Sequence, residues 1–315
     1  MIDLKKLIMV VSGGALLTGC NYSHPTSVTS LSLAQTEAPA PTTVAADPTS
    51  NPIKTYARAQ VACNPLTGSS AAVDYNLGLA ARLYYSPNGG PQYSSVEDYM
   101  NHGTDLGVDI FFNQVNMIPT YFANGFASEA GPAFQTQDGT VLTEWFGIQY
   151  KSVLRLTSHN APGNYQLASL SDDGSILYLD PTGTGANPVA FINSDGLHAP
   201  KLACATSTLR MSANTHIPMQ LDFFQGPRYH IANMLLWRRI PDALDPTAAS
   251  SLHDDACGAQ GTDVFFHVDQ TTSVPTTAYQ DLLNRGWEVI PEENFVLPET
   301  DPANPCFPGG GLFSS

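Results

Sequence analysis

Between residues 75 and 240 the chain consists of short segments in which apolar and polar residues alternate. Alternation with a period of two puts successive side chains on opposite faces of a β-strand, whereas a long amphipathic helix needs a 3.6-residue period. Gly, Asp, Asn and Pro separate the segments, as they commonly do between strands. The expected strands lie at 75–85, 105–115, 142–157, 164–170, 175–180, 187–193, 207–212, 217–225 and 230–240. The pattern predicts an all-β protein, an antiparallel β-sandwich or barrel.

The residues after Pro241 have a different character and predict a small mixed extension over 242–315. Two strands are expected to flank one short helix. Thr276 or Thr277 would cap this helix at its start, and Gly286 would end it. The three elements are expected at 262–270, 276–286 and 287–291.

The first twenty residues predict an export signal that is not part of the fold. Lys5 and Lys6 precede an apolar run, Leu7 to Leu17, that is too short for a permanent membrane helix. The following LTGC, which ends at Cys20, resembles the lipobox of bacterial lipoproteins. The resemblance implies a signal peptide over 1–19 and a lipidated Cys20. The alternative is an ordinary signal peptide in which Cys20 is incidental.

Residues 20–58 are rich in Ser, Thr, Pro and Ala and show no hydrophobic period. Such a composition cannot bury enough surface to offset its ordering entropy, so we expect a disordered tether. The β-domain is then expected over 59–241. The lipid-anchored protein would lie in the bacterial cell envelope, and Asn21, directly after Cys20, favours the outer membrane over the inner one.

Four cysteines remain after Cys20, and an even number in an exported chain predicts two disulfides. They are Cys63, Cys204, Cys257 and Cys306. Three connectivities are open, and no CxxC spacing indicates zinc.

The formal net charge of the chain is −15, which disfavours nucleic acid and anionic membrane surfaces as partners. The same charge is compatible with binding a cation. The sequence contains no GxSxG, HExxH, Walker or GxGxxG motif. We therefore expect a binding protein and not an enzyme.

Three stretches resemble, in order, the PA-14 (protective-antigen) domain family. Residues 163–180 are similar to its central hairpin, in which a Gly-x-Tyr strand runs into an Asp-Asp turn. Residues 192–198 are similar to the corner that follows, and 218–239 to the closing pair of strands. The resemblance covers about 74 to 241 and implies an antiparallel β-sandwich or barrel.

In the lectin-like adhesins of that family, two consecutive aspartates at the position of Asp172 and Asp173 bind a calcium ion that coordinates sugar hydroxyls. Two carboxylates on one turn suit a hard divalent cation, which would also cancel their mutual repulsion. The alternative is a structural Asp-Asp-Gly turn, in which the side chains bind local N–H groups.

The family takes further ligands from the loop between its last two strands, which here is QGPRYH. Gln225 lies nearest the position of the family's asparagine, and Arg228 and Tyr229 could recognise a ligand directly. The resemblance thus implies glycan recognition or adhesion through Gln225, Arg228 and Tyr229. The alternatives are an assembly lipoprotein whose β-domain docks an envelope or surface protein, and an accessory of a carbohydrate-active enzyme.

Other residues are assigned to structure. Trp145 and Trp237 lie among apolar neighbours and are expected in the core. His253, Asp254 and Asp255 are expected in a surface loop.

Overall fold

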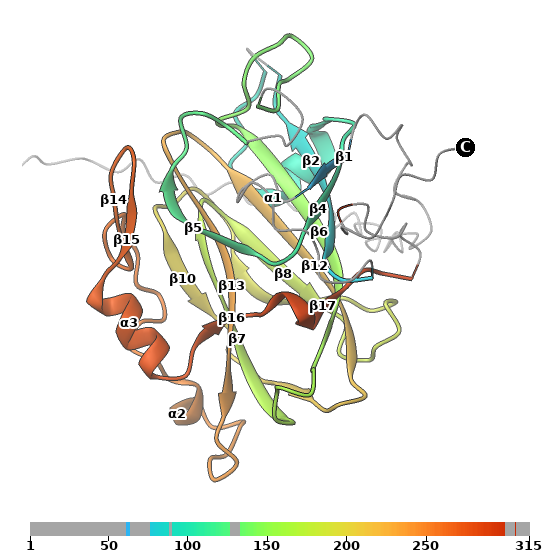
Figure 1. Cartoon of the computed structure of the whole chain (residues 1–315), viewed down its shortest axis with the longest axis vertical. Helices are drawn as coiled ribbons and strands as arrows, with labels where there is room; N and C mark the ends of the chain where they lie inside the picture. Colours follow the sequence, from blue (N-terminus) through green and yellow to red (C-terminus); the bar gives the residue numbers. More distant parts are fainter. Residues whose placement is uncertain (1–60, 64–75, 88–89, 127–132, 300–305, 307–315) are drawn as a thin grey trace, which may run out of the picture. The chain divides into compact units, whose positions relative to one another are not determined.

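Two β-sheets face each other in the computed structural model, which describes residues 61–63, 76–87, 90–126, 133–299 and 306 (Figure 1). The first sheet has nine strands, whose main path runs β1-β4-β2-β6-β12-β8-β9, with β3 paired to β2 and β17 paired to β6. Its strands are β1 (Val61–Cys63), β2 (Leu79–Tyr85), β3 (Thr104–Asp105), β4 (Asp109–Phe112), β6 (Phe146–Arg155), β8 (Ser175–Leu179), β9 (Val189–Ser194), β12 (His216–Gln225) and β17 (Phe295–Val296).

The second sheet has six strands, whose main path runs β10-β7-β13-β16, with β11 paired to β7 and β5 paired to β13. Its strands are β5 (Asn116–Tyr121), β7 (Gly163–Asp172), β10 (Lys201–Cys204), β11 (Leu209–Met211), β13 (His230–Ile240) and β16 (Glu288–Val289). Pairing is antiparallel except between β1 and β4. The predicted all-β sandwich is confirmed.

The core lies between the sheets and follows from the alternation seen in the sequence. Leu221 and Phe223 of β12 point inward, as do Leu235 and Trp237 of β13, and all four side chains are fully buried. Burying large apolar side chains of this kind contributes about 1.5–3 kcal/mol each. Trp237 therefore lies in the core, as predicted.

Helix α1 (Val96–His102) covers part of the outer face of the first sheet. The Ser95 side chain caps it by accepting a hydrogen bond from the N–H of Asp98. Tyr99 stacks on Phe224 of β12, with ring centroids 5.5 Å apart. A Cβ at Gly147 of β6 would lie 2.7 Å from the Cβ of Tyr99, so glycine permits this close approach.

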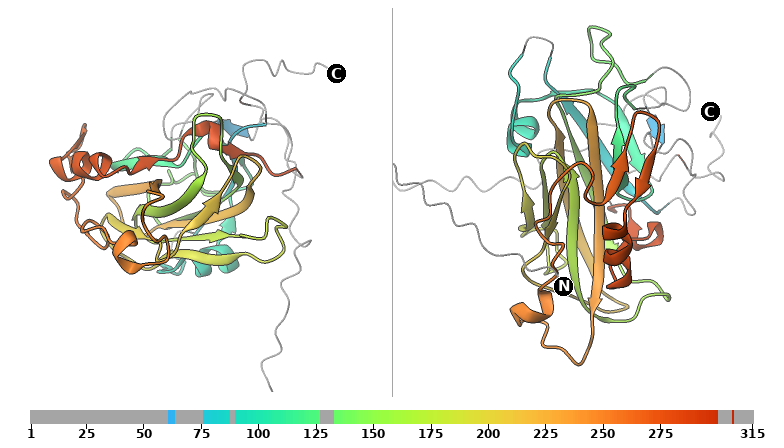
Figure 2. Two further views of the ribbon diagram at one scale, coloured as in Figure 1. Left: turned by 90° about the horizontal axis from the view of Figure 1, so that it is seen from below. Right: turned by 90° about the vertical axis from the view of Figure 1, so that its left-hand side faces the viewer.

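Much of the C-terminal extension packs on the outer face of the second sheet, as Figures 1 and 2 show for α3, whereas β16 pairs with β13 as a strand of that sheet. Phe265, Phe266, Leu282 and Trp287 join buried residues of β7 and β13 there. Its elements are α2 (Ala249–Leu252), β14 (Phe266–Val268), β15 (Ser273–Pro275), α3 (Thr277–Asn284) and the 3-10 helix η2 (Glu292–Asn294), followed by β17. The predicted cap is confirmed, since the Thr276 side chain accepts from the N–H of Tyr279.

A disulfide joins Cys204 of β10 to Cys257 of the extension, across 53 residues of sequence. Cys306 is also disulfide-bonded. The side chain of Cys63 lies outside the described residues, as do the predicted signal peptide, Cys20 and the tether to residue 58. In the part of the chain that the structure describes, no helix is long and apolar enough to cross a membrane.

Candidate functional site

The Asp-Asp pair lies where the chain passes from the second sheet to the first. Asp172 ends β7, Asp173 and Gly174 form the turn, and Ser175 begins β8. The peptide bond between the two aspartates is cis. Only 6% of Asp172 and 5% of Asp173 is exposed, so two carboxylates are buried side by side.

Backbone donors from two loops satisfy the Asp173 carboxylate. Its Oδ1 accepts a hydrogen bond from the N–H of His198 at 2.9 Å, and its Oδ2 accepts one from the N–H of Gly226 at 2.7 Å. A Cβ at Gly226 would lie 2.4 Å from Leu197 Cδ2 and 2.9 Å from Asp173 Oδ2, so the loop approaches this closely only with glycine. Asp173 thereby ties the turn after β9 to the loop between β12 and β13.

The Asp172 carboxylate accepts no hydrogen bond from any residue that the structure describes. Burial, and next the neighbouring Asp173 carboxylate, raise the pKa of Asp172 to about 8. Burial also raises the pKa of Asp173, although the two N–H donors oppose the shift. No lysine or arginine among the described residues forms an ion pair with either carboxylate, and His198 alone is a nearby basic group that opposes the shift at Asp173, so burial favours the neutral form of Asp172.

This donor set fits a hard cation such as Ca²⁺, which takes carboxylate, carbonyl and water oxygens. No group of three or more His, Cys, Asp or Glu side chains that could hold a metal is present among the described residues. A cation here would thus be held by Asp172 and Asp173, with the remaining positions filled by carbonyl, water or ligand oxygens.

Gln225 is fully buried at the end of β12 and braces the loop that follows. Its Nε2 donates to the carbonyl oxygens of Pro227, at 3.0 Å, and His230, at 2.9 Å. Its Oε1 is buried and has no hydrogen-bond partner among the residues that the structure describes. The side chain therefore shapes the loop, and its proposed contact with a ligand stays a prediction.

Arg228 and Tyr229 lie at the surface of the same loop. An Arg228 guanidinium nitrogen lies 3.0 Å from Glu144 Oε1, and the backbone N–H of Arg228 donates to Glu144 Oε2 at 3.2 Å. Tyr229 is 49% exposed and stacks on Tyr121 of β5, with ring centroids 5.2 Å apart. Both side chains are accessible to a ligand.

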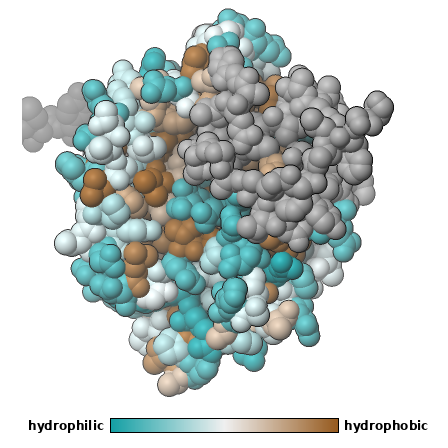
Figure 3. Space-filling model, viewed as in Figure 1, coloured by the Kyte–Doolittle hydropathy of each residue, from teal (hydrophilic) through white to brown (hydrophobic). Residues whose placement is uncertain are grey.

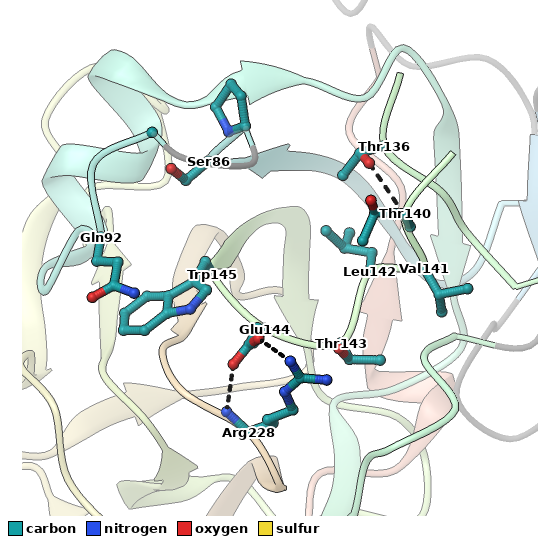
Figure 4. A pocket seen from close by; sticks show the side chains of 12 residues that line it. Ser86, Gln92, Thr136, Thr140, Val141, Leu142, Thr143, Glu144, Trp145 and Arg228 are labelled. Carbon is teal, nitrogen blue, oxygen red and sulfur yellow. Dashed lines mark hydrogen bonds and ion pairs between the residues drawn. The ribbon is translucent and has the colours of Figure 1, made fainter. Parts of the chain in front are cut away.

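Trp145 is not the core residue expected from its neighbours. It precedes β6, is only partly buried, and lines a surface pocket together with Glu144 and Arg228 (Figure 4). Its φ of 58° is left-handed, which breaks the strand at this point. This conformation was not predictable from the sequence pattern, because a tryptophan followed by FGIQY fits a strand.

Asp254 is also not in a surface loop, because its side chain is fully buried. Burial by itself would raise the pKa of Asp254, but hydrogen bonds from Arg285, Ala256 and Trp287 outweigh burial and hold it at about 2. Asp255 next to it is exposed, as expected. Asp254 thus has a structural role in the extension.

No protein-family model matches the chain. No curated protein matches it either.

Among solved structures, the chain is similar to the PA14 domain of the antifreeze protein MpAFP, with 13% identity over 53% of this chain and 84% of that one and a TM-score of 0.36. It is similar to the PA14 sugar-binding domain from an RTX adhesin, with 15% identity over 52% of this chain and 90% of that one and a TM-score of 0.36. It is also similar to the A domain of epithelial adhesin 6 from Candida glabrata, solved with Galβ1-3GlcNAc. The identity is 13% over 57% of this chain and 85% of that one, and the TM-score is 0.34.

Proposed function

We propose that this protein is a lipid-anchored binding protein of the bacterial envelope that recognises glycans with the help of calcium at Asp172 and Asp173. The observation that carries the proposal is the buried Asp172 carboxylate, which accepts no hydrogen bond from the described residues and stands beside a second carboxylate. An ion pair or donor set would normally accompany such groups. A calcium ion would supply the missing charge.

The surroundings of the pair support ligand binding at the same end of the sandwich. The loop that donates the Gly226 N–H to Asp173 also carries the accessible Arg228 and Tyr229. A glycan hydroxyl could complete the coordination of the ion while these side chains contact neighbouring groups. Arg and Tyr suit this task, because they offer fixed donors and a flat apolar surface.

A glycan array, probed with the full chain in calcium and in chelator, tests the proposal. We expect a restricted set of glycans whose binding depends on calcium, so that their signal is lost both in chelator and in an Asp172→Asn/Asp173→Asn variant. Asp255→Asn, which removes an exposed carboxylate outside the site, should bind like the parent. Absence of calcium-dependent glycan binding would contradict the proposal and leave the alternative of an assembly module that docks a protein.

A further inference from the structure

A pocket of about 350 Å³ lies beside the β12–β13 loop, within the usual size range for small-molecule sites. Three parts of the chain contribute to its lining: the first supplies Ser86, Pro87, Gly90 and Gln92, the second Thr136 and residues 140–145, and the third Arg228. Figure 4 shows the Trp145 indole between the Gln92 and Glu144 side chains in this view. On the face shown in Figure 3, hydrophobic residues are scattered among hydrophilic ones outside the grey region.

Trp145 differs from the other two tryptophans in its unsatisfied hydrogen-bonding capacity. Trp237 Nε1 donates to Glu288 and Trp287 Nε1 donates to Asp254, at 2.8 and 2.9 Å, and both rings are buried. Trp145 Nε1 has no acceptor among the described residues, and its ring is only partly buried. A buried or half-buried indole normally finds a partner for its N–H. The pocket therefore presents both an apolar ring and a free donor.

The polar groups around the ring are balanced in charge. Glu144 and Arg228 neutralise each other, and 50% of the Arg228 side chain and 24% of the Glu144 side chain is exposed. The Gln92 amide and the Thr143 hydroxyl also lack a hydrogen-bond partner within the described part of the chain. Since the chain as a whole carries a net charge of −15, an anionic ligand is disfavoured.

We propose that this pocket binds a neutral pyranose ring and does so without a cation. The C–H face of the sugar would stack on the Trp145 indole, and its hydroxyls would bond to Trp145 Nε1, Gln92 and the Glu144–Arg228 pair. A neutral pyranose matches these features, because it combines an apolar face with a rim of donors and acceptors. The Trp145 backbone geometry holds the ring in place between two hydrogen bonds, one to Gly226 O at 3.1 Å and one from the Ser86 N–H at 2.9 Å.

This subsite is separate from the aspartate pair and goes beyond the function proposed above. The Gly226 N–H donates to the Asp173 carboxylate, and the Gly226 carbonyl accepts from the Trp145 backbone N–H. Gly226 therefore contacts both sites. A glycan longer than one residue could contact both. The pocket itself needs no calcium.

Fluorescence titration of the full chain in chelator with the methyl glycosides of glucose, galactose and mannose tests the subsite. Trp145 is the only one of the three tryptophans with an exposed ring surface, so its emission reports occupancy. We expect at least one glycoside to bind and to change the emission, with calorimetry giving the same affinity. Trp145→Ala should weaken the affinity by about tenfold or more.

Two variants separate a binding role from a folding role. Trp145→Gly suits the left-handed backbone at this position, so it should keep the melting temperature near that of Trp145→Ala or above it while losing sugar binding. Val274→Ala, on the exposed β15, should bind like the parent.

The proposal is overturned if none of the three glycosides binds, or if Trp145→Gly binds as well as the parent. It is also overturned if binding is lost in chelator or in Asp172→Asn/Asp173→Asn, which would assign all sugar recognition to the calcium site. If a glycoside binds in chelator but the protein binds no calcium, the result supports the pocket and contradicts only the proposed calcium site at the aspartate pair.

Discussion

Four buried aspartates of this protein differ in how their charge is balanced. Asp254 receives N–H donors from two arginines, a tryptophan and the backbone, and its pKa stays low. Asp173 receives two backbone donors, while Asp172 receives none from the described part of the chain. Asp222, on the outer face of the first sheet, accepts from the Gln220 amide at 2.9 Å and has Lys151 nearby. These differences decide which carboxylates stabilise the fold and which strain it.

Asp222 should make stability depend on pH. Burial raises its pKa to about 6, although Gln220, Gln149 and Lys151 oppose the shift, and the Tyr84 and Tyr178 hydroxyls lie close enough to interact. Because the folded pKa lies above the unfolded value, the unfolded chain binds fewer protons between about pH 4 and 6. As the pH rises from about 4 to 6, the free energy of unfolding should therefore fall by about 1–3 kcal/mol.

Denaturant unfolding of Asp222→Asn as a function of pH checks this expectation. The variant should lack the decrease in unfolding free energy that Asp222 causes as the pH rises, and it should be more stable than the parent near neutral pH. Asp255→Asn, which changes an exposed carboxylate, should retain the fall. If parent and Asp222→Asn show the same pH dependence, Asp222 does not titrate as described.

At the scale of elements, one buried network fastens the C-terminal extension to the second sheet. Asp254 bonds Arg285 from the end of α3, with Nε and a terminal nitrogen both 2.9 Å from its oxygens. Asp254 also accepts from Trp287 Nε1 at 2.9 Å, and Arg238 of β13 lies 3.3 Å away. The Arg238 guanidinium stands over the Trp287 ring, 4.9 Å from its centroid. Four side chains thus join α3, β13 and the loop after α2.

Asp254→Ala should destabilise the protein by about 3–5 kcal/mol, because it leaves two arginines without their buried partner. Denaturant unfolding followed by Trp fluorescence measures the change. The matched control is Asp255→Ala, one residue away with an exposed side chain, which should stay within about 0.5 kcal/mol of the parent. Equal stability of the two variants would show that the network does not hold the extension.

The sequence predicted most strands, because alternation survives wherever a strand has one face in the core. β6, β7, β8, β12 and β13 all fall on predicted segments. β10, with only four residues, was not predicted, since a segment that short carries too little pattern. Helix α1 was also not predicted, because it depends on Ser95, on Gly147 and on packing against Phe224.

The candidate sites depended more strongly on tertiary contacts. The aspartate pair was visible in the sequence, because two adjacent carboxylates before glycine are unusual within strands. Its donors were not visible, since His198 and Gly226 are 25 and 53 residues from Asp173. The position of Trp145 in the pocket and the burial of Asp254 likewise arise from segments that meet only in the folded chain.

At the scale of the whole molecule, the net charge of −15 and the aspartate pair favour the same kind of ligand. A strongly acidic chain attracts cations and repels anionic partners. A β-sandwich with the proposed cation site and the proposed neutral pocket at neighbouring loops would suit the recognition of uncharged glycans. The predicted lipid anchor and tether would hold the β-domain at the envelope.

Calorimetric titration of calcium into the full chain, next to Asp172→Asn/Asp173→Asn, tests the central claim most directly. We predict binding in the micromolar to millimolar range, its loss in the double variant, and proton release that changes the heat between buffers of different ionisation enthalpy. Proton release is expected because the pKa of Asp172 is raised to about 8. No heat, together with a melting temperature that neither calcium nor chelator changes, would contradict the account and make the aspartate pair a structural turn.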